Sequence, residues 1–262
     1  MSTTRLFGLA RCALVGMIHL RPLPGSPGWG GSLDEVLRAA RGDAEALLQG
    51  GCDALLVENM GDLPFLRGRV EPETVAAAAI CAREVAGLGA PTGVQLLAGA
   101  NREALGVALA AGASFVRVEA FAYAHVADEG WLEACAGELL RARRGLAAPV
   151  QVWADVQKKH AAHAVTADLS LSELARGHAF CGADALVVPG RETAAPPAPA
   201  DVEAARVAGL PVIVGSGVGP ADAGALAARA DGLIVGTWLK EQGDWRRPVD
   251  PARVRALREA MG

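Results

Sequence analysis

The chain has 262 residues and a formal net charge of −4 at neutral pH, and 52% of its residues are apolar. That length and apolar content suit one large globular domain, while the acidic balance argues against a nucleic-acid-binding protein. Five dispersed cysteines with no CxxC pair indicate free thiols in a reducing compartment, so we expect a cytoplasmic protein that binds no nucleic acid.

The first apolar run, residues 12–20, is too short to cross a membrane, and Pro22 and Pro24 follow it. No small-residue cleavage site of the kind that ends a signal peptide comes after it. We therefore interpret this run as the first strand of the fold. No apolar stretch of membrane-spanning length occurs elsewhere in the sequence, so we predict no transmembrane segment.

Short apolar runs alternate with helical patterns along the chain. In chain order, we expect strands at residues 13–19, 53–59, 93–97, 115–119, 150–155, 185–188, 212–214 and 233–235. We expect helices at residues 33–48, 72–86, 101–111, 128–146, 171–181, 201–208, 220–230 and 250–261. Ser32 and Ser170 are the expected N-caps of two of these helices, and Asp128 is that of the long helix to residue 146.

Eight strand–helix units without a composition break predict one parallel α/β domain over residues 1–262. Strands this short and this continuously apolar are typical of parallel sheets that are buried on both faces. A single (β/α)8 TIM barrel with eight parallel strands accounts for the length and the number of units. The alternative is an open, doubly wound sheet, which would usually carry G-x-G-x-x-G after its first strand, whereas this strand ends in His19.

Two glycine turns near the C-terminus predict a phosphate site. Residues 215–219 read GSGVG directly after the seventh strand, and Gly236 with Thr237 follows the eighth. Glycines let backbone N–H groups approach an anion, and in TIM barrels this site lies in the loops after strands 7 and 8. We expect the phosphate to contact Ser216, Gly217, Gly236, Thr237 and Lys240. The alternative is that these glycines only make tight turns.

Polar residues end several of the expected strands, and this is the end at which barrel enzymes carry their active sites. They are His19, Glu58 with Asn59, Gln95, Arg117 with Glu119, Asp155, and Arg191 with Glu192. Glu58 and Asp155 are candidates for a general base or a metal ligand, or they are solvated strand ends. His19 suits acid/base work or metal binding, and the alternative is a packed histidine.

Lys158, Lys159 and His160 follow Asp155 closely. A lysine here could bind phosphate, form a Schiff base or assist enolisation, although a position beyond the strand disfavours the Schiff base. The spacing of His160 and His163 permits a metal cluster with Asp155, but it is not diagnostic. We predict no cofactor with confidence, and a divalent metal stays open.

Several motifs resemble the BtpA/SgcQ family across nearly the whole chain. The specific ones are VGMIHL at 15–20 with PLPGSP at 22–27, and VENMGDLPF at 57–65. Others are FVRV at 115–118, ADV at 154–156, GSGV at 215–218 and residues 230–240. The resemblance implies a TIM barrel of the phosphate-binding type. The family is named for a role in photosystem I biogenesis, and other members sit beside sugar-utilisation genes.

The chain departs from the family pattern where substrate would lie. The Asn-containing segment expected after the third strand is here residues 93–101, which end in Asn101. Glu119 stands where the family usually has Asn, and Pro189 and Ala194 interrupt a T-G-x-x-T-G motif. The resemblance therefore implies a shared scaffold and phosphate site, with a substrate that could differ.

The favoured function is an enzyme acting on a small phosphorylated metabolite, either a sugar phosphate or a phosphoribosyl compound, as an isomerase, lyase or hydrolase. We expect catalytic roles for Glu58, Asp155, His19, His160 and Lys159, and substrate contacts from Asn59, Arg117 and Asn101. The alternatives are a non-catalytic assembly factor for a membrane complex and a divalent-metal hydrolase that uses His19, Glu58, Asp155 and His160. A barrel this rich in apolar residues is also expected to self-associate.

Overall fold

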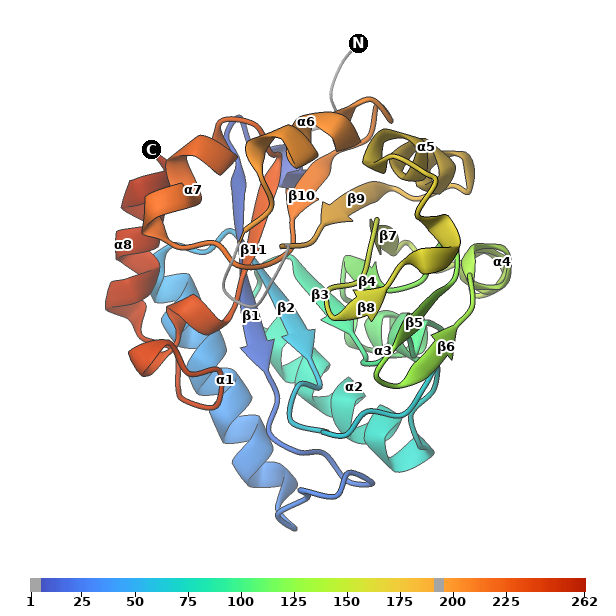
Figure 1. Ribbon diagram of the computed structural model, residues 1–262. Coiled ribbons are helices and arrows are strands. Elements are labelled where there is room, and N and C mark those ends of the chain that lie inside the picture. The colour runs from blue at the N-terminus through green and yellow to red at the C-terminus, as the bar shows by residue number, and fades with distance from the viewer. Residues whose placement is uncertain (1–5, 191–195) are drawn as a thin grey trace.

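The computed structural model describes residues 6–190 and 196–262 and contains a closed barrel of eight parallel strands (Figure 1). The barrel strands are β1 (Ala13–His19), β2 (Ala54–Glu58), β3 (Thr92–Gln95), β4 (Phe115–Val118), β7 (Gln151–Asp155), β9 (Ala185–Val188), β10 (Val212–Val214) and β11 (Gly232–Val235). Each strand pairs with its neighbours in chain order, and β11 closes the ring on β1. The predicted (β/α)8 barrel is confirmed, and the open sheet is ruled out.

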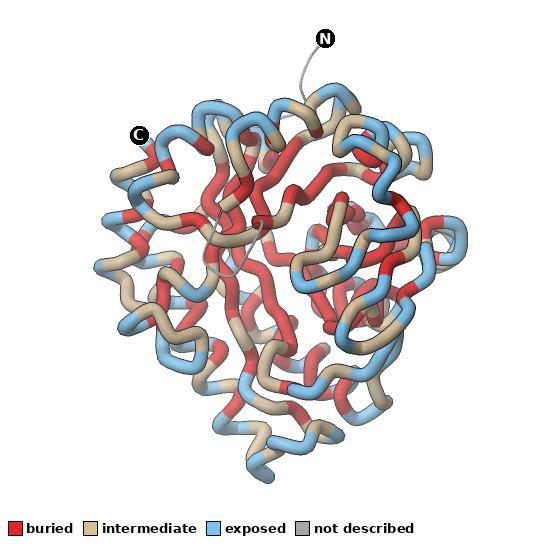
Figure 2. The backbone as a smooth tube through the Cα atoms, viewed as in Figure 1, coloured by how far each residue is buried: buried red, intermediate tan, exposed pale blue. Residues whose placement is uncertain are grey.

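Helices surround the barrel and expose only their outer faces to solvent (Figures 1 and 2). They are α1 (Leu33–Gly50), α2 (Pro72–Ala86), α3 (Asn101–Ala111), α4 (Ala136–Gly145), α5 (Leu171–Phe180), α6 (Pro199–Arg206), α7 (Pro220–Ala227) and α8 (Pro251–Met261). Ser32 caps α1 by accepting a hydrogen bond from the N–H of Glu35, and Ser170 with Glu173 forms a complete capping box on α5. Both caps were predicted, since the side-chain oxygens satisfy N–H groups that have no partner inside the helix.

The predicted helix 128–146 is wrong over its first half. The chain instead forms β5 (His125–Ala127) and β6 (Gly130–Leu132), and α4 begins only at Ala136. Gly130 adopts a φ of +106° at the turn, a conformation that breaks a helix, and β8 (Ala161–Ala162) completes a three-stranded antiparallel sheet. The strand that pairs with β5 comes from a distant part of the chain. Tertiary strand pairing therefore overrides the helix preference of the local sequence here.

An aromatic layer fills the N-terminal half of the barrel. The rings of Phe115 on β4 and Trp153 on β7 stack with centroids 3.7 Å apart and planes 12° from parallel. Phe7, in the short 3-10 helix η1 (Leu6–Gly8), packs against both rings with centroids about 6 Å away. Gly93 on β3 leaves the room that Phe115 needs, because a Cβ there would lie 2.1 Å from the ring. This end of the barrel is therefore a packed core.

We expect Gly93→Ala to destabilise the fold by about 1–3 kcal/mol, because the added methyl overlaps the ring of Phe115 in a close-packed layer. Urea unfolding would measure the change. Gly106→Ala is the matched control, since no atom lies within 4 Å of a Cβ at this helical position and alanine favours a helix. Equal stability of Gly93→Ala and the native protein would contradict this account of the layer.

Candidate active site

The strand period of two carries charged side chains to the C-terminal mouth of the barrel. Side chains on alternate residues of a barrel strand point inward, so the residue two positions after an interior residue is also interior. The interior residues Met17, Leu56, Gly93, Phe115 and Trp153 are followed in this way by His19, Glu58, Gln95, Arg117 and Asp155. His19, Glu58 and Gln95 are also direct partners in the strand register. The sequence prediction of a polar mouth is confirmed.

Arg117 and Asp155 form a buried ion pair at this mouth. Nε of Arg117 lies 3.0 and 3.2 Å from the two carboxylate oxygens of Asp155. The guanidinium also donates to the carbonyl oxygen of Gly215 over 3.3 Å. Only 12% of the Arg117 side chain and 4% of the Asp155 side chain are exposed. Burial raises the pKa of Asp155, while the charge of Arg117 and its hydrogen bond lower it.

Glu58 is the group at the mouth best suited to proton transfer. Burial raises its pKa to about 7, Arg117 opposes that shift, and the neighbouring carboxylates of Glu119 and Asp155 add to it. Its Oε2 atom lies 3.6 Å from Nε2 of His19. Burial and the charge of Lys240 lower the pKa of His19 to about 3, so this imidazole is neutral at pH 7. Glu58 is therefore poised to gain or lose a proton near neutral pH.

Glu119 belongs to the same cluster, although no specific role was predicted for it from the sequence. Burial raises its pKa to about 7, and Lys158 opposes the shift. The ammonium of Lys158 lies 3.6 Å from Glu119 and 2.8 Å from Glu129 in the β5–β6 turn. The available signal was its position two residues after Arg117, which continues the inward alternation. The antiparallel sheet is thus fastened to the mouth by a shared lysine.

The loop after β7 brings Lys159 to the cluster but leaves His160 at the surface. Burial and Arg117 lower the pKa of Lys159 and Glu58 raises it, so this ammonium lies within electrostatic reach of both. His160 is exposed. Nε2 of His163 lies 2.9 Å from the carbonyl oxygen of Lys158, and its ring packs against His125. In the described parts of the chain, no group of three or more His, Cys, Asp or Glu side chains is placed to hold a metal ion.

The two glycine turns lie directly beside the charged cluster. A Cβ on Gly215 would be 3.1 Å from the guanidinium of Arg117, and one on Gly236 would be 2.8 Å from the ring of His19. Gly217 has a φ of +80°, and Ser216 accepts a hydrogen bond from the N–H of Gly190 over 2.9 Å. Within residues 6–190 and 196–262, the N–H groups of Gly217 and Gly236 have no backbone acceptor. Thr237 is exposed at the rim.

Lys240 is buried and paired with a carboxylate of the scaffold, which argues against its predicted role in phosphate binding. Only 1% of its side chain is exposed, and its ammonium pairs with Asp43 on α1. The other oxygen of Asp43 accepts the N–H of Val249 over 2.8 Å. Proximity along the sequence suggested a phosphate ligand, but in the fold Asp43 takes up the charge of this ammonium. The pair instead fastens the segment before α8 to α1.

Asn59 and Asn101 are committed to loop structure, which also argues against their predicted substrate contacts. The Asn59 carbonyl accepts the N–H of Leu97 over 2.7 Å, and its amide donates to Asp62 over 3.0 Å. The Asn101 amide donates to the carbonyl oxygen of Glu119 over 2.7 Å. Both side chains are buried. Each asparagine therefore stabilises a loop at the mouth of the barrel. Two other strand-end residues from the sequence analysis, Arg191 and Glu192, lie outside the described residues.

One buried oxygen at the mouth remains without a donor. Oε1 of Gln95 makes no hydrogen bond within the described chain, whereas Oε2 of Glu119 has the ammonium of Lys158 3.6 Å away. Buried polar atoms are nearly always paired in folded proteins, so such atoms in a charged cavity mark places where a ligand or water supplies the partner. Hydroxyl groups are suitable donors. Sequence reasoning listed Gln95 among the strand ends but gave it no role.

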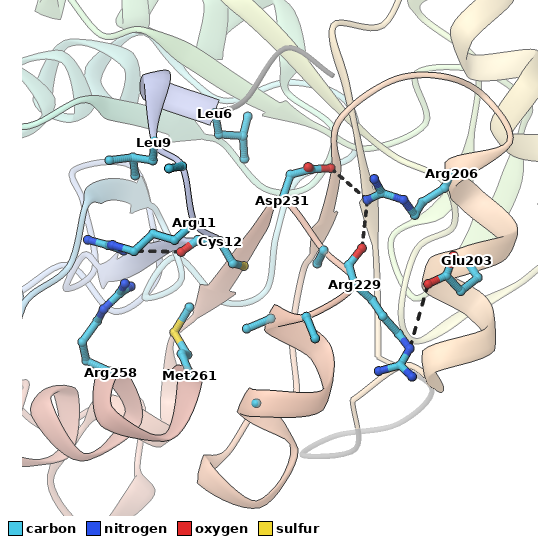
Figure 3. A pocket seen from close by; sticks show the side chains of 16 residues that line it. Leu6, Leu9, Arg11, Cys12, Glu203, Arg206, Arg229, Asp231, Arg258 and Met261 are labelled. Carbon is cyan, nitrogen blue, oxygen red and sulfur yellow. Dashed lines mark hydrogen bonds and ion pairs between the residues drawn. The ribbon is translucent and has the colours of Figure 1, made fainter. Parts of the chain in front are cut away.

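A cavity of about 480 Å³ opens at the opposite end of the barrel (Figure 3). Its arginines are paired: Arg206 reaches Asp231 over 3.3 Å, and Arg11 and Arg258 both reach Asp53. Asp53 and Asp231 also accept backbone N–H groups at the entries to β1 and β10. These ion pairs hold the N-terminal ends of the strands in place. We therefore do not assign the active site to this cavity.

Comparison with known sequences extends over almost the whole chain. A model of the BtpA family matches residues 10–262. An uncharacterised mitochondrial protein of Caenorhabditis elegans is 38% identical over 259 residues, which cover 96% of this chain and 93% of that protein. The photosystem I biogenesis protein BtpA of Synechocystis is 39% identical, with 95% of this chain and 87% of that protein covered.

Solved structures show the same fold at low sequence identity. 3-Hexulose-6-phosphate synthase superposes with a TM-score of 0.59 at 18% identity, covering 95% of this chain and all of that chain. Phosphoribosyl anthranilate isomerase of Thermus thermophilus superposes with a TM-score of 0.55 at 18% identity, covering 95% and 98%. Among the described helices, none has the length and apolar character that a membrane span requires.

The pKa of Glu58 predicts a pH-dependent stability. Its carboxyl group titrates at about 7 in the fold against an ordinary value of 4.5, so folding favours the protonated form. This contribution is fully present below pH 4.5 and is lost as pH rises to about 7. We expect Glu58→Gln to gain stability relative to the native protein over this window, by on the order of 2–3 kcal/mol.

Urea unfolding at several pH values would measure this difference. Glu133→Gln, at an exposed position, is the control, and its effect should stay constant across the same window. A stability difference between Glu58→Gln and the native protein that does not change with pH would contradict the shifted pKa.

Proposed function

The chain belongs to the BtpA family, and from the geometry of its barrel mouth we propose that it is an enzyme acting on a small phosphorylated metabolite by acid/base chemistry. The observation that carries this proposal is a carboxyl group with a pKa of about 7, that of Glu58, in a buried cluster beside two glycine turns. Carboxyl groups tuned toward neutral pH are characteristic of catalytic acids and bases.

The glycine turns are the proposed phosphate site. The N–H groups of Gly217 and Gly236, with the hydroxyls of Ser216 and Thr237, would donate to the phosphate oxygens. Arg117 lies next to the first turn and adds positive charge nearby. Two solved structures of the same fold carry names that refer to a hexulose phosphate and a phosphoribosyl compound, which supports the phosphate site through fold analogy.

Proton transfer is assigned to Glu58. At pH 7 its carboxyl group exists in both protonation states, so it can act as base or acid on a substrate carbon or oxygen above the barrel. Neutral His19, 3.6 Å away, would orient Glu58 or the substrate through a hydrogen bond. Arg117, held in place by Asp155, would stabilise negative charge that develops on the substrate. Lys159 and His160, from the loop after β7, would act at the rim.

The Gln95 oxygen that lacks a donor favours a substrate with hydroxyl groups. A sugar phosphate or a phosphoribosyl compound combines such hydroxyls with a phosphate. Isomerisation, carbon–carbon cleavage and hydrolysis of such compounds can each use a proton-transferring carboxyl group, and the proposal covers these three reaction classes. The cytoplasmic location and self-association inferred from the sequence remain predictions, and the C. elegans relative is named as mitochondrial.

A second candidate function follows from the name of the Synechocystis relative, a photosystem I biogenesis protein. In that case the chain would act by docking on a partner, and the mouth would need no phosphate ligand. The two functions separate in a ligand screen, because only the enzyme predicts stabilisation by a phosphorylated small molecule.

The phosphate site is tested by thermal unfolding with inorganic phosphate, sugar phosphates and phosphoribosyl compounds. A ligand that binds only the folded protein raises the unfolding midpoint. At a ligand concentration one hundred times the Kd, the free energy of unfolding increases by about 2.7 kcal/mol. We expect the native protein to show such a shift and Gly217→Asp to lose it, because a carboxylate would repel the phosphate.

Gly209→Asp is the matched control. Gly209 has a φ of +73°, close to the +80° of Gly217, so both substitutions impose the same backbone strain, but Gly209 lies at an exposed turn after α6. It should keep the ligand-induced shift. The absence of a shift with every phosphorylated ligand would reject the phosphate site and leave the docking function as the one to pursue.

We expect Asp155→Asn to lower kcat on the substrate that the screen identifies by about 10²–10⁴-fold, since the substitution releases the guanidinium of Arg117 from its charged partner. Steady-state kinetics would measure the loss. Asp231→Asn removes the comparable partner of Arg206 at the opposite end of the barrel and should leave kcat unchanged. Full activity in Asp155→Asn would remove this residue from the mechanism.

A further inference from the structure

A groove of about 710 Å³ opens beside the barrel mouth. It lies between the segment after β1, the helix α1 and the loop that precedes α8, and His19 forms part of its wall. His19 is also 3.6 Å from Glu58, so the groove adjoins the proposed catalytic cluster through one shared side chain. Ligand pockets commonly have volumes of about 300–1,000 Å³, which places this groove in the range for a small organic molecule.

Three of the four arginines that line the groove have no ion-pair partner among the described residues. Arg21, Arg38 and Arg247 line it and are exposed. Their guanidinium groups make no hydrogen bond or ion pair with any other described residue. Asp43 is the sole acidic residue among the lining residues, and Lys240 neutralises it. This local excess of positive charge stands out in a chain whose net charge is −4.

The arginines of the N-terminal cavity differ from this set. At the N-terminal cavity Arg206 pairs with Asp231 (Figure 3), and Arg11 and Arg258 share Asp53. The fold therefore supplies carboxylates where arginines have a structural task. Among the described residues, Arg21, Arg38 and Arg247 have no such ion pair, so their donors are free for an anion, whereas Arg246 pairs with Asp244.

Apolar side chains provide the remaining surface of the groove. Leu20, Pro22, Leu63 and Trp245 line it, and the indole of Trp245 packs edge-on against the ring of His19 with centroids 6.1 Å apart. The guanidinium of Arg246 lies 4.6 Å above the same indole. An apolar surface bordered by cations suits a ligand that has an apolar or ring-shaped body and an anionic group.

We propose that this groove binds the negatively charged, apolar-bodied part of a ligand next to the barrel mouth, with Arg38 and Arg247 contacting the anionic group and Trp245 the body. The site is separate from the phosphate site at Gly217 and Gly236, and it goes beyond the proposed function. A substrate that occupied both would be elongated and anionic at two ends.

A dye with this chemistry tests the proposal. 8-Anilinonaphthalene-1-sulfonate carries one sulfonate on an apolar ring body, and N-phenyl-1-naphthylamine is the same body without the charge. We expect saturable binding of the sulfonate to the folded native protein, measured by dye fluorescence, and at least about tenfold weaker binding of the uncharged dye. Quenching of the intrinsic emission by the sulfonate should decrease in Trp245→Phe.

The double variant Arg38→Gln/Arg247→Gln is expected to weaken binding of the sulfonate about tenfold. Arg255→Gln is the matched control, because Arg255 is exposed on α8 and does not line the groove. Both variants should keep the native unfolding midpoint, which excludes dye binding to a loosened fold. Equal dye affinity in the double variant and the native protein, or no saturable site, would overturn the proposal.

Failure of the groove and failure of the proposed function give different results. Gly217→Asp is expected to bind the sulfonate as the native protein does, while it loses the stabilisation by phosphorylated ligands. Arginine-dependent dye binding without any phosphate effect would support the groove and reject the phosphate site. The reverse pattern would reject the groove and leave the proposed enzyme function intact.

Discussion

The buried pair of Arg117 and Asp155 is the interaction on which the barrel mouth depends. It joins β4 to β7, and through the carbonyl oxygen of Gly215 it also reaches the first glycine turn. A buried ion pair is tolerated only when its hydrogen bonds are satisfied, because removing two charges from water is costly. The charge of Arg117 also restrains the upward pKa shifts of Glu58 and Glu119, so the electrostatics of the whole cluster depend on this pair.

The balance of charge around that pair suits an anionic substrate. Three carboxyl groups, those of Glu58, Glu119 and Asp155, share the mouth with Arg117, Lys158 and Lys159. Because burial raises the pKa of Glu58 and Glu119 to about 7, neither group is fully ionised at neutral pH, which reduces the negative charge beside Arg117 and Lys159. A low-dielectric cavity strengthens the attraction of these two cations for an incoming anion. The acid/base groups and the proposed phosphate site therefore support one another.

Stability and chemistry occupy opposite ends of the same barrel. At the N-terminal end, Phe7, Phe115 and Trp153 fill the interior, and paired arginines organise the strand entries. At the C-terminal end the same alternation presents charged groups, and the antiparallel sheet around β5 covers one side of them through Lys158. The groove beside His19 lies at this C-terminal end, where its unpaired arginines can contact an anionic ligand.

Much of this arrangement could be read from the sequence because it depends on local rules. The apolar runs determined the eight barrel strands, and the period of two placed His19, Glu58, Arg117 and Asp155 at one end. Ser32 and Ser170 identified two helix starts, since a cap needs only its own first turn. The glycines at 217 and 236 were recognisable because each directly follows a strand.

Tertiary structure alone decided the rest, since it depends on contacts between residues distant in the sequence. Lys240 pairs with Asp43, which lies about two hundred residues earlier. Asn59 and Asn101 bind neighbouring loops, and residues 125–132 form strands because β8 is available to pair with β5. The pKa of Glu58 follows from its burial and from the charges that the closed barrel gathers around it. A sequence names the charged groups of a site, but only the folded chain sets their distances and their exposure to water, on which their chemistry depends.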